Sequence, residues 1–187
     1  MDKILTDLRI TIAVGVLLAV GLMFAPYYQP PLGLWHGAFQ WLHVFFGITW
    51  IGLLYYFNFV QIPTMPLIPA ELKPGVSKYI APKALFYFRW AAAFTVLTGL
   101  ILAHLYHELK EAMMLEASAR LIGIGMYLAL IMAANVWFVI WPNQKKALGI
   151  VPADDAAKAK AARTAMIASR TNTLLSVPML LCMTNFH

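Results

Sequence analysis

The sequence predicts an all-α integral membrane protein, a single domain over residues 1–187 that forms a bundle of five transmembrane helices. Apolar residues make up 61% of the 187 residues and charged residues 12%, against about 45–50% and about 25% in soluble domains. The apolar residues gather in long runs, and most basic residues lie in every second connection between them. Despite the net charge of +6, this placement is typical of membrane topology and not of a nucleic-acid-binding face.

The expected membrane helices cover residues 8–26, 35–60, 86–106, 120–141 and 171–187. Most reach the roughly 20 residues that a helix needs to cross a bilayer. The chain starts with MDKILTDLR, which mixes both charge signs, so we expect the first helix to be a retained anchor and not a signal peptide. The last is short, but an alanine-rich helix with Asp154 as its N-cap is expected to lead into it.

The basic residues predict the orientation of the helices. Alternate connections divide the 14 lysines and arginines 12 to 2, which places the N-terminus in the cytoplasm and the C-terminus outside. Arg89 is expected to anchor the third helix at the interface. Five prolines between residues 61 and 85 predict that this segment is not continuous helix and lies along the cytoplasmic surface.

All five histidines fall in the outer half of this topology. His43, His104 and His187 lie at comparable depth on three different helices, and ionisable residues inside a membrane usually face the bundle interior. His36 lies about 10 Å further out than His43 on the same stripe of the second helix. His36 and His107 also suit the interfacial belt. The pattern predicts a metal or haem centre with His43 as one ligand, His187 or His104 opposite, and His36 as a further candidate.

Other residues fit a haem at this depth. Gly47 lies one turn from His43 and leaves a gap for a haem edge, and Gly99 on the third helix is expected to do the same. Trp50 continues the stripe of His43. Arg120 is the expected partner for a haem propionate. Gly123 and Gly125 on the fourth helix are expected to leave room in the same way.

Asn135 could hydrogen-bond a ligand or another helix, and the bond between helices is favoured.

A single noncovalent haem is the favoured cofactor. Cys182 is the only cysteine, which excludes a Cys-x-x-Cys-His attachment site and makes the expected group a b-type haem. The spacing of seven positions from His36 to His43 is too short for two stacked haems on one helix. Copper is the second choice, because imidazole and methionine both suit it. A structural subunit whose histidines only bind interfacial groups is the alternative without a cofactor.

Three segments resemble a known family. They are HVFFGITWIGLLYYFNFVQIP (43–63), NVWFVIWPNQKKALG (135–149) and RTNTLLSVPMLLCMTNFH (170–187). They are similar to the N-terminal membrane domain of the membrane-bound, cytochrome-c-linked urate hydroxylases (the PuuD family), in a short form without the cytochrome c domain. The resemblance implies a redox membrane domain and carries over His43 and, approximately, His187.

The expected function comes from the haem and the resemblance together. The protein is expected to be a multi-pass protein of the bacterial inner membrane that passes electrons at the outer face, as part of a larger redox complex. Its expected partners are membrane lipid, other redox membrane subunits or a separate cytochrome c, and a quinone. The alternative is an oxidoreductase that oxidises urate or a related small molecule, with a separate cytochrome c as acceptor.

Overall fold

The computed structural model describes residues 2–30 and 32–185, and every regular element in these ranges is helical. The α-helices are α1 (Asp2–Thr6), α2 (Leu8–Met23), α3 (Leu34–Tyr55), α4 (Ile62–Thr64), α5 (Lys73–Gly75), α6 (Ala81–Leu105), α7 (Leu109–Met113), α8 (Arg120–Asn135), α9 (Trp141–Ala147) and α10 (Asp155–Thr184). The π-helical turns η1 (Tyr56–Gln61), η3 (Val76–Ile80) and η4 (Val136–Ile140) and the 3-10 turn η2 (Met65–Leu67) extend them. The all-α prediction is confirmed for this part of the chain.

Three continuous helical stretches are long and apolar enough to cross a membrane. Within the described ranges these are Leu34–Leu67, Lys73–Leu105 and Arg120–Ala147, and they contain or nearly contain the expected spans 35–60, 86–106 and 120–141. α2 is apolar but has 16 residues, about 24 Å of helix against a hydrocarbon layer of about 30 Å. The chain is therefore compatible with a membrane protein of three spans, while the count of five and the orientation stay predictions.

α10 begins where the sequence predicts a helix and runs without interruption to Thr184. Its N-cap is Asp154, whose side chain accepts a hydrogen bond from the backbone N–H of Ala157 at 2.7 Å. The expected lead-in helix and the expected segment 171–187 are thus one element over the residues described. Residues 186–187 lie outside them.

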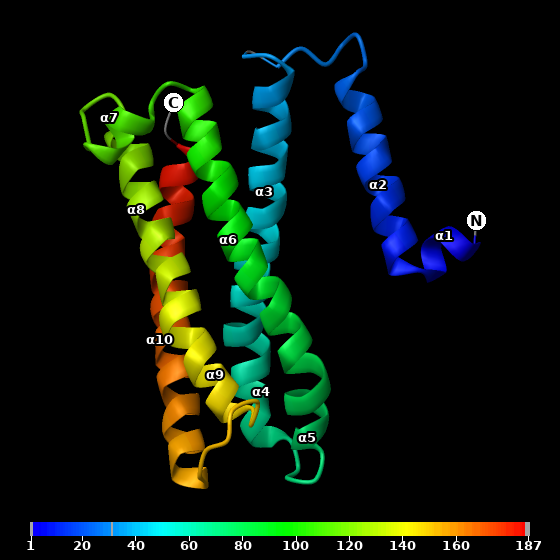
Figure 1. Cartoon of the computed structure of the whole chain (residues 1–187), viewed down its shortest axis with the longest axis vertical. Helices are drawn as coiled ribbons and strands as arrows, with labels where there is room; N and C mark the ends of the chain where they lie inside the picture. The colour runs from blue at the N-terminus through cyan, green and yellow to red at the C-terminus, as the bar shows by residue number, and fades with distance from the viewer. Residues whose placement is uncertain (1, 31, 186–187) are drawn as a thin grey trace.

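The prediction that residues 61–85 are not one continuous helix is confirmed, but most of these residues are helical, which the sequence does not predict. The helix after α3 continues to Leu67, and helix resumes at Lys73, so only residues 68–72 break it. The two stretches meet in a tight turn at the lower end of the bundle (Figure 1) and not in a long surface segment.

The π-helical turns explain how helix tolerates these prolines. The residue before Pro63 donates its backbone N–H to Phe57 O, five residues back, and the residues before Pro82 and Pro142 do the same to Val76 and Val136. A proline has no N–H and clashes with the carbonyl four residues earlier. A turn with one extra residue accommodates both effects, so the helix continues past the proline.

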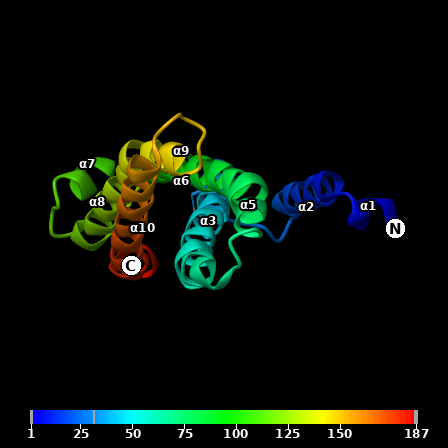
Figure 2. The ribbon, with the colours of Figure 1, turned by 90° about the horizontal axis from the view of Figure 1, so that it is seen from below.

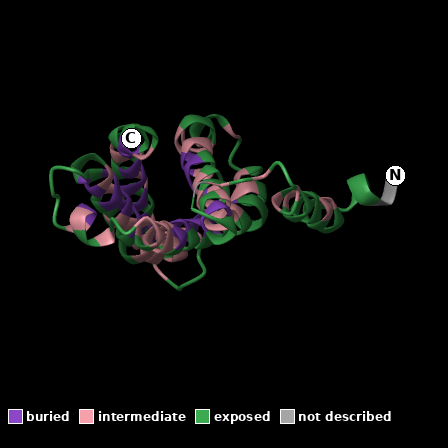
Figure 3. Cartoon of the chain, turned by 90° about the horizontal axis from the view of Figure 1, so that it is seen from above, coloured by how far each residue is buried: buried purple, intermediate pink, exposed green. Residues whose placement is uncertain are grey.

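The four long helices α3, α6, α8 and α10 pack as two pairs. α3 lies along α6, and α8 lies along α10. From below, the pairs sit side by side, with α2 outside both (Figure 2). None of the residues of α2 is buried. Buried positions face the interior between the pairs, and exposed positions face outward (Figure 3). The core contains Trp50, Leu54, Phe88, Met132 and Val136, each at most 1% exposed.

Polar side chains join α10 to both neighbours inside this apolar bundle. Asn172 is 0% exposed and donates to Met132 O at 3.0 Å, and Asn135 Nδ2 donates to Asn172 Oδ1 at 2.7 Å. On the other side, Asn58 Nδ2 donates to Ser169 Oγ at 2.8 Å. In a bilayer, packing and hydrogen bonds between helices hold a bundle together, because lipid is as apolar as the side chains. These contacts therefore fix how α10 sits against α3 and α8.

Candidate functional site

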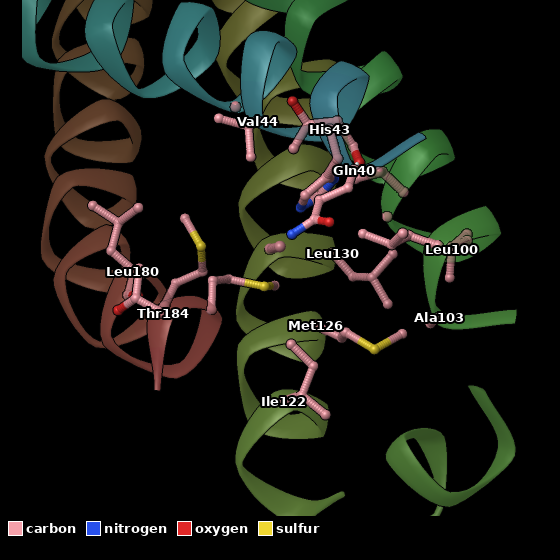
Figure 4. A pocket seen from close by; sticks show the side chains of 18 of the residues that line it. Gln40, His43, Val44, Leu100, Ala103, Ile122, Met126, Leu130, Leu180 and Thr184 are labelled. Carbon is pink, nitrogen blue, oxygen red and sulfur yellow. Dashed lines mark hydrogen bonds between the residues drawn. The ribbon is translucent and has the colours of Figure 1, made fainter. Parts of the chain in front are cut away.

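A cavity of about 370 Å³ lies between α3, α6, α8 and α10 towards the upper end of the bundle. Its wall is mostly apolar, with Val44, Leu100, Leu130 and Leu180 among the lining residues. Figure 4 shows His43 and Gln40 reaching from α3 into this space, across from side chains of α8 and α10. The cavity therefore offers one imidazole in apolar surroundings.

The hydrogen bond at Nδ1 fixes the His43 ring. Nδ1 lies 3.0 Å from the backbone oxygen of Thr95 and 3.4 Å from the hydroxyl of Thr98, which itself donates to Phe94 O at 2.6 Å. A carbonyl oxygen only accepts, so Nδ1 carries the hydrogen and Nε2 keeps its lone pair. Nε2 has no hydrogen-bond partner in the described part of the chain. This arrangement is typical of histidines that ligate a metal through Nε2.

Gly99 makes room for the imidazole itself. A Cβ at this position would lie 2.8 Å from Cε1 and 3.1 Å from Nδ1 of His43. The sequence assigns this glycine to a haem edge, whereas the structure places it against the ligand ring. Gly47 also lines the cavity, and a Cβ there would meet only Thr95 Cγ2 at 3.9 Å, so Gly47 keeps the open space expected beside His43.

Gly99→Ala is expected to displace the His43 ring and to weaken its bond to Thr95. Overpacking of this kind lowers the free energy of unfolding by about 1–3 kcal/mol. Gly52→Ala is the control, because nothing lies within 4 Å of its added Cβ and alanine is the better helix former by about 1 kcal/mol. Thermal unfolding in detergent measures both variants. Equal melting temperatures for the two would contradict the role given to Gly99.

The other histidines lie elsewhere. His104 is exposed and does not line the cavity. Gly99 on the same helix faces His43. His104 comes five positions later, so its side chain points about 140° away from that direction. His36 is 2% exposed and packs edge-on against the Tyr106 ring at a centroid distance of 4.2 Å, outside the cavity wall. The structure thus brings neither of them to His43. His187 lies outside the described residues.

The structure also places the remaining predicted cofactor residues. Trp50 is fully buried and lines the cavity, and its Nε1 has no partner in residues 2–30 and 32–185. Arg120 is exposed, does not line the cavity, and donates from Nε to Leu115 O at 3.2 Å. Asn135 bonds Asn172 and Ala168 O, which is the helix–helix role favoured by the sequence.

The two glycines of α8 serve helix packing. A Cβ at Gly123 would collide with the Ala112 carbonyl of α7, and a Cβ at Gly125 would lie 2.8 Å from Cys182 Cβ of α10. Both positions are filled by neighbouring helices, so the expectation that they leave space beside a haem is wrong.

Three thioethers that the sequence does not single out line the cavity. They belong to Met126, Met179 and Met183. The two on α10 share a face at a spacing of four residues, but ten methionines in an apolar chain make that signal weak. Thioether sulfur is a soft ligand that suits copper(I) and the sixth position of a haem iron. Among the described residues, no group of three or more His, Cys, Asp or Glu side chains is placed to hold a metal ion.

Tyr106 and Glu108 add polar groups to the lining of the cavity. Burial, and then the Glu108 carboxylate, raise the pKa of the Tyr106 phenol above its usual value. The phenol therefore keeps its proton over the physiological range and remains a hydrogen-bond donor.

Residues 108–187 match the family model described as urate oxidase N-terminal. The match contains two of the three segments that carry the resemblance, 135–149 and 170–187, and it does not include 43–63. Comparison with curated proteins found no significant match, and comparison with solved structures found none either.

Proposed function

We propose, from the premise that residues 108–187 match the urate oxidase N-terminal family, that the protein is a redox membrane protein that binds one b-type haem in the His43 cavity. The observation that carries this proposal is the fixed tautomer of His43. Its Nδ1 is bound to Thr95 O, and its Nε2, which bonds none of the described residues, lies at an apolar cavity. A bound haem would supply one-electron redox chemistry.

The residues around the cavity fit such a group on several counts. The Thr95 carbonyl orients the imidazole and increases its basicity as a ligand. Gly47 leaves space one turn below His43, and the wall of the cavity is mostly apolar. With Cys182 as the only cysteine, the haem is noncovalent.

Two kinds of residue could hold the haem together with His43. Met126, Met179 and Met183 line the cavity, and His187 comes three residues after Thr184, which also lines it. A methionine ligand would raise the reduction potential relative to a second histidine ligand. The same set of one imidazole and several thioethers also suits copper, which remains the second choice of metal.

The proposed location is based on the charges. The basic residues of the α4–α5 turn region, α9 and the start of α10 lie at the lower end of the bundle (Figure 1), opposite to the histidines. The positive-inside rule supports a cytoplasmic location for this end, and the haem would then lie near the outer face of a bacterial inner membrane. There the protein would pass electrons between a quinone or another redox membrane subunit and a separate cytochrome c.

The family match supports a second candidate function, the oxidation of urate or a related small molecule with a separate cytochrome c as acceptor. This candidate uses the same redox centre and differs in the source of electrons.

The reduced-minus-oxidised visible spectrum of the purified protein tests the proposal. We expect an α band at a b-type position and about one iron per chain by metal analysis. Reduction of the haem by urate would favour the second candidate. Reduction of the haem by quinol alone would favour electron transfer. If the purified protein holds neither haem nor copper, both candidate functions are contradicted. The remaining alternative is then a structural subunit.

A further inference from the structure

Arg89 is a buried cation in the stretch Lys73–Leu105, near the start of its apolar run 86–106 and on the side of the basic end of the bundle. It is 9% exposed, and its guanidinium carbon lies 3.4 Å from the centroid of the Trp141 ring on α9. Its Nη1 is buried and has no hydrogen-bond partner within the described ranges. The only ion pair found in that part of the chain joins Lys158 and Asp155. Arg89 therefore lacks the anion that a buried guanidinium normally has.

The stacking on Trp141 does not offset this burial. A cation over an indole gains less free energy than the removal of a charged group from water costs, even after relaxation of the protein. The difference favours binding of an anion at the guanidinium.

Lys145 brings a second positive charge to the same ring. Its Nζ lies 5.6 Å from the centroid of Trp141, so Arg89 and Lys145 share one indole. The π-helical turn η4 sets this arrangement, because it adds one residue to the turn just before Trp141 and so rotates α9 by about 100°. The turn thus brings Lys145 of α9 to the same indole as Arg89. A bound anion would stabilise these two positive charges.

We propose that Arg89 and Lys145 bind the phosphate of an anionic phospholipid headgroup at the basic end of the bundle. Phe86, Tyr87 and Trp90, the neighbours of Arg89 on α6, are 50%, 50% and 42% exposed and form an aromatic surface typical of the lipid interface. Basic pockets between membrane helices on the cytoplasmic side are known to select anionic headgroups. The site is separate from the His43 cavity, so its test does not depend on haem.

Lipid binding to the purified full chain tests this site, with phosphatidylglycerol against phosphatidylcholine in titrations followed by native mass spectrometry. Arg89→Gln and Lys145→Gln are each expected to weaken phosphatidylglycerol binding by about tenfold, since each removes one charge-assisted contact. Lys146→Gln is the matched control, because Lys146 is exposed and, unlike Lys145, does not lie over the Trp141 ring. It should leave binding unchanged.

Three outcomes would overturn the proposal. They are equal loss of binding in Lys145→Gln and Lys146→Gln, unchanged binding in both Lys145→Gln and Arg89→Gln, and displacement of the lipid by inorganic phosphate at equal concentration. The last result would assign the site to a soluble phosphate. If Arg89→Gln does not fold, the comparison of Lys145→Gln with Lys146→Gln decides, because neither lysine is buried.

Discussion

His43→Gly is expected to abolish the b-type absorption band, and added imidazole is expected to restore it. The substitution removes the Nε2 ligand and leaves a space of imidazole size between Gly99 and the Thr95 carbonyl. Free imidazole can occupy that space and ligate iron through one ring nitrogen, because the carbonyl still accepts the N–H of the other. Visible difference spectra of the variant with and without imidazole measure the effect.

His104→Ala is the control for this experiment. His104 lies on α6 at a similar depth but is exposed and outside the cavity wall, so its loss is expected to leave the band unchanged. The opposite pattern, with the band lost in His104→Ala and kept in His43→Gly, would move the centre to another part of the bundle.

Asn172→Leu is expected to lower the free energy of unfolding by about 1–3 kcal/mol, the range for a buried hydrogen-bonded group whose partner is left behind. Asn172 is fully buried and joins α10 to α8 through Asn135 and the Met132 carbonyl. Leucine has a similar size but none of these bonds. Thermal unfolding in detergent gives the loss as a lower melting temperature.

A double-mutant cycle separates the bond from the packing. Asn135→Leu combined with Asn172→Leu should cost clearly less than the sum of the two single changes, because both remove the same 2.7 Å contact. Thr171→Val is the control, since Thr171 is exposed beside Asn172 and bonds only its own helix at Ile167 O. Strict additivity in the cycle would show that the two amides do not stabilise the bundle together.

The sequence predicts the helical segments well because their signals are local. Apolar runs define the three spans, and the Asp154 cap defines the start of α10. The segment 61–85 is mispredicted for a local reason too. Prolines normally end a helix, and nothing in the residues before Pro63 or Pro82 reveals that the chain forms a π-helical turn there.

The site is predicted only in part, because helix rotation depends on contacts between distant residues. Residue counting gives the depth of His43 and His104 along their helices, and it places both at the same end of the bundle. It does not give the direction in which they point. That direction is set by the packing of Gly99 against the His43 ring, 56 positions apart in the chain.

The burial of a charged side chain is a further feature that a single sequence does not predict. The sequence predicts Arg89 as an interfacial anchor from its position near the end of an apolar run, but it does not predict the stacking on Trp141 or the exposure of only 9%. The partner comes from a segment about fifty residues later, and the π-helical turn η4 determines which face of α9 meets α6.

An experimental structure of the protein purified with its native cofactor would give the distance from Nε2 of His43 to a metal, and this distance decides whether the cavity is a haem site. We expect the iron of a haem about 2 Å from Nε2, a distance typical of imidazole ligation, with Nδ1 still bonded to the Thr95 carbonyl. A cavity filled by lipid, or a haem ligated by other histidines while Nε2 faces no metal, would contradict the proposed centre.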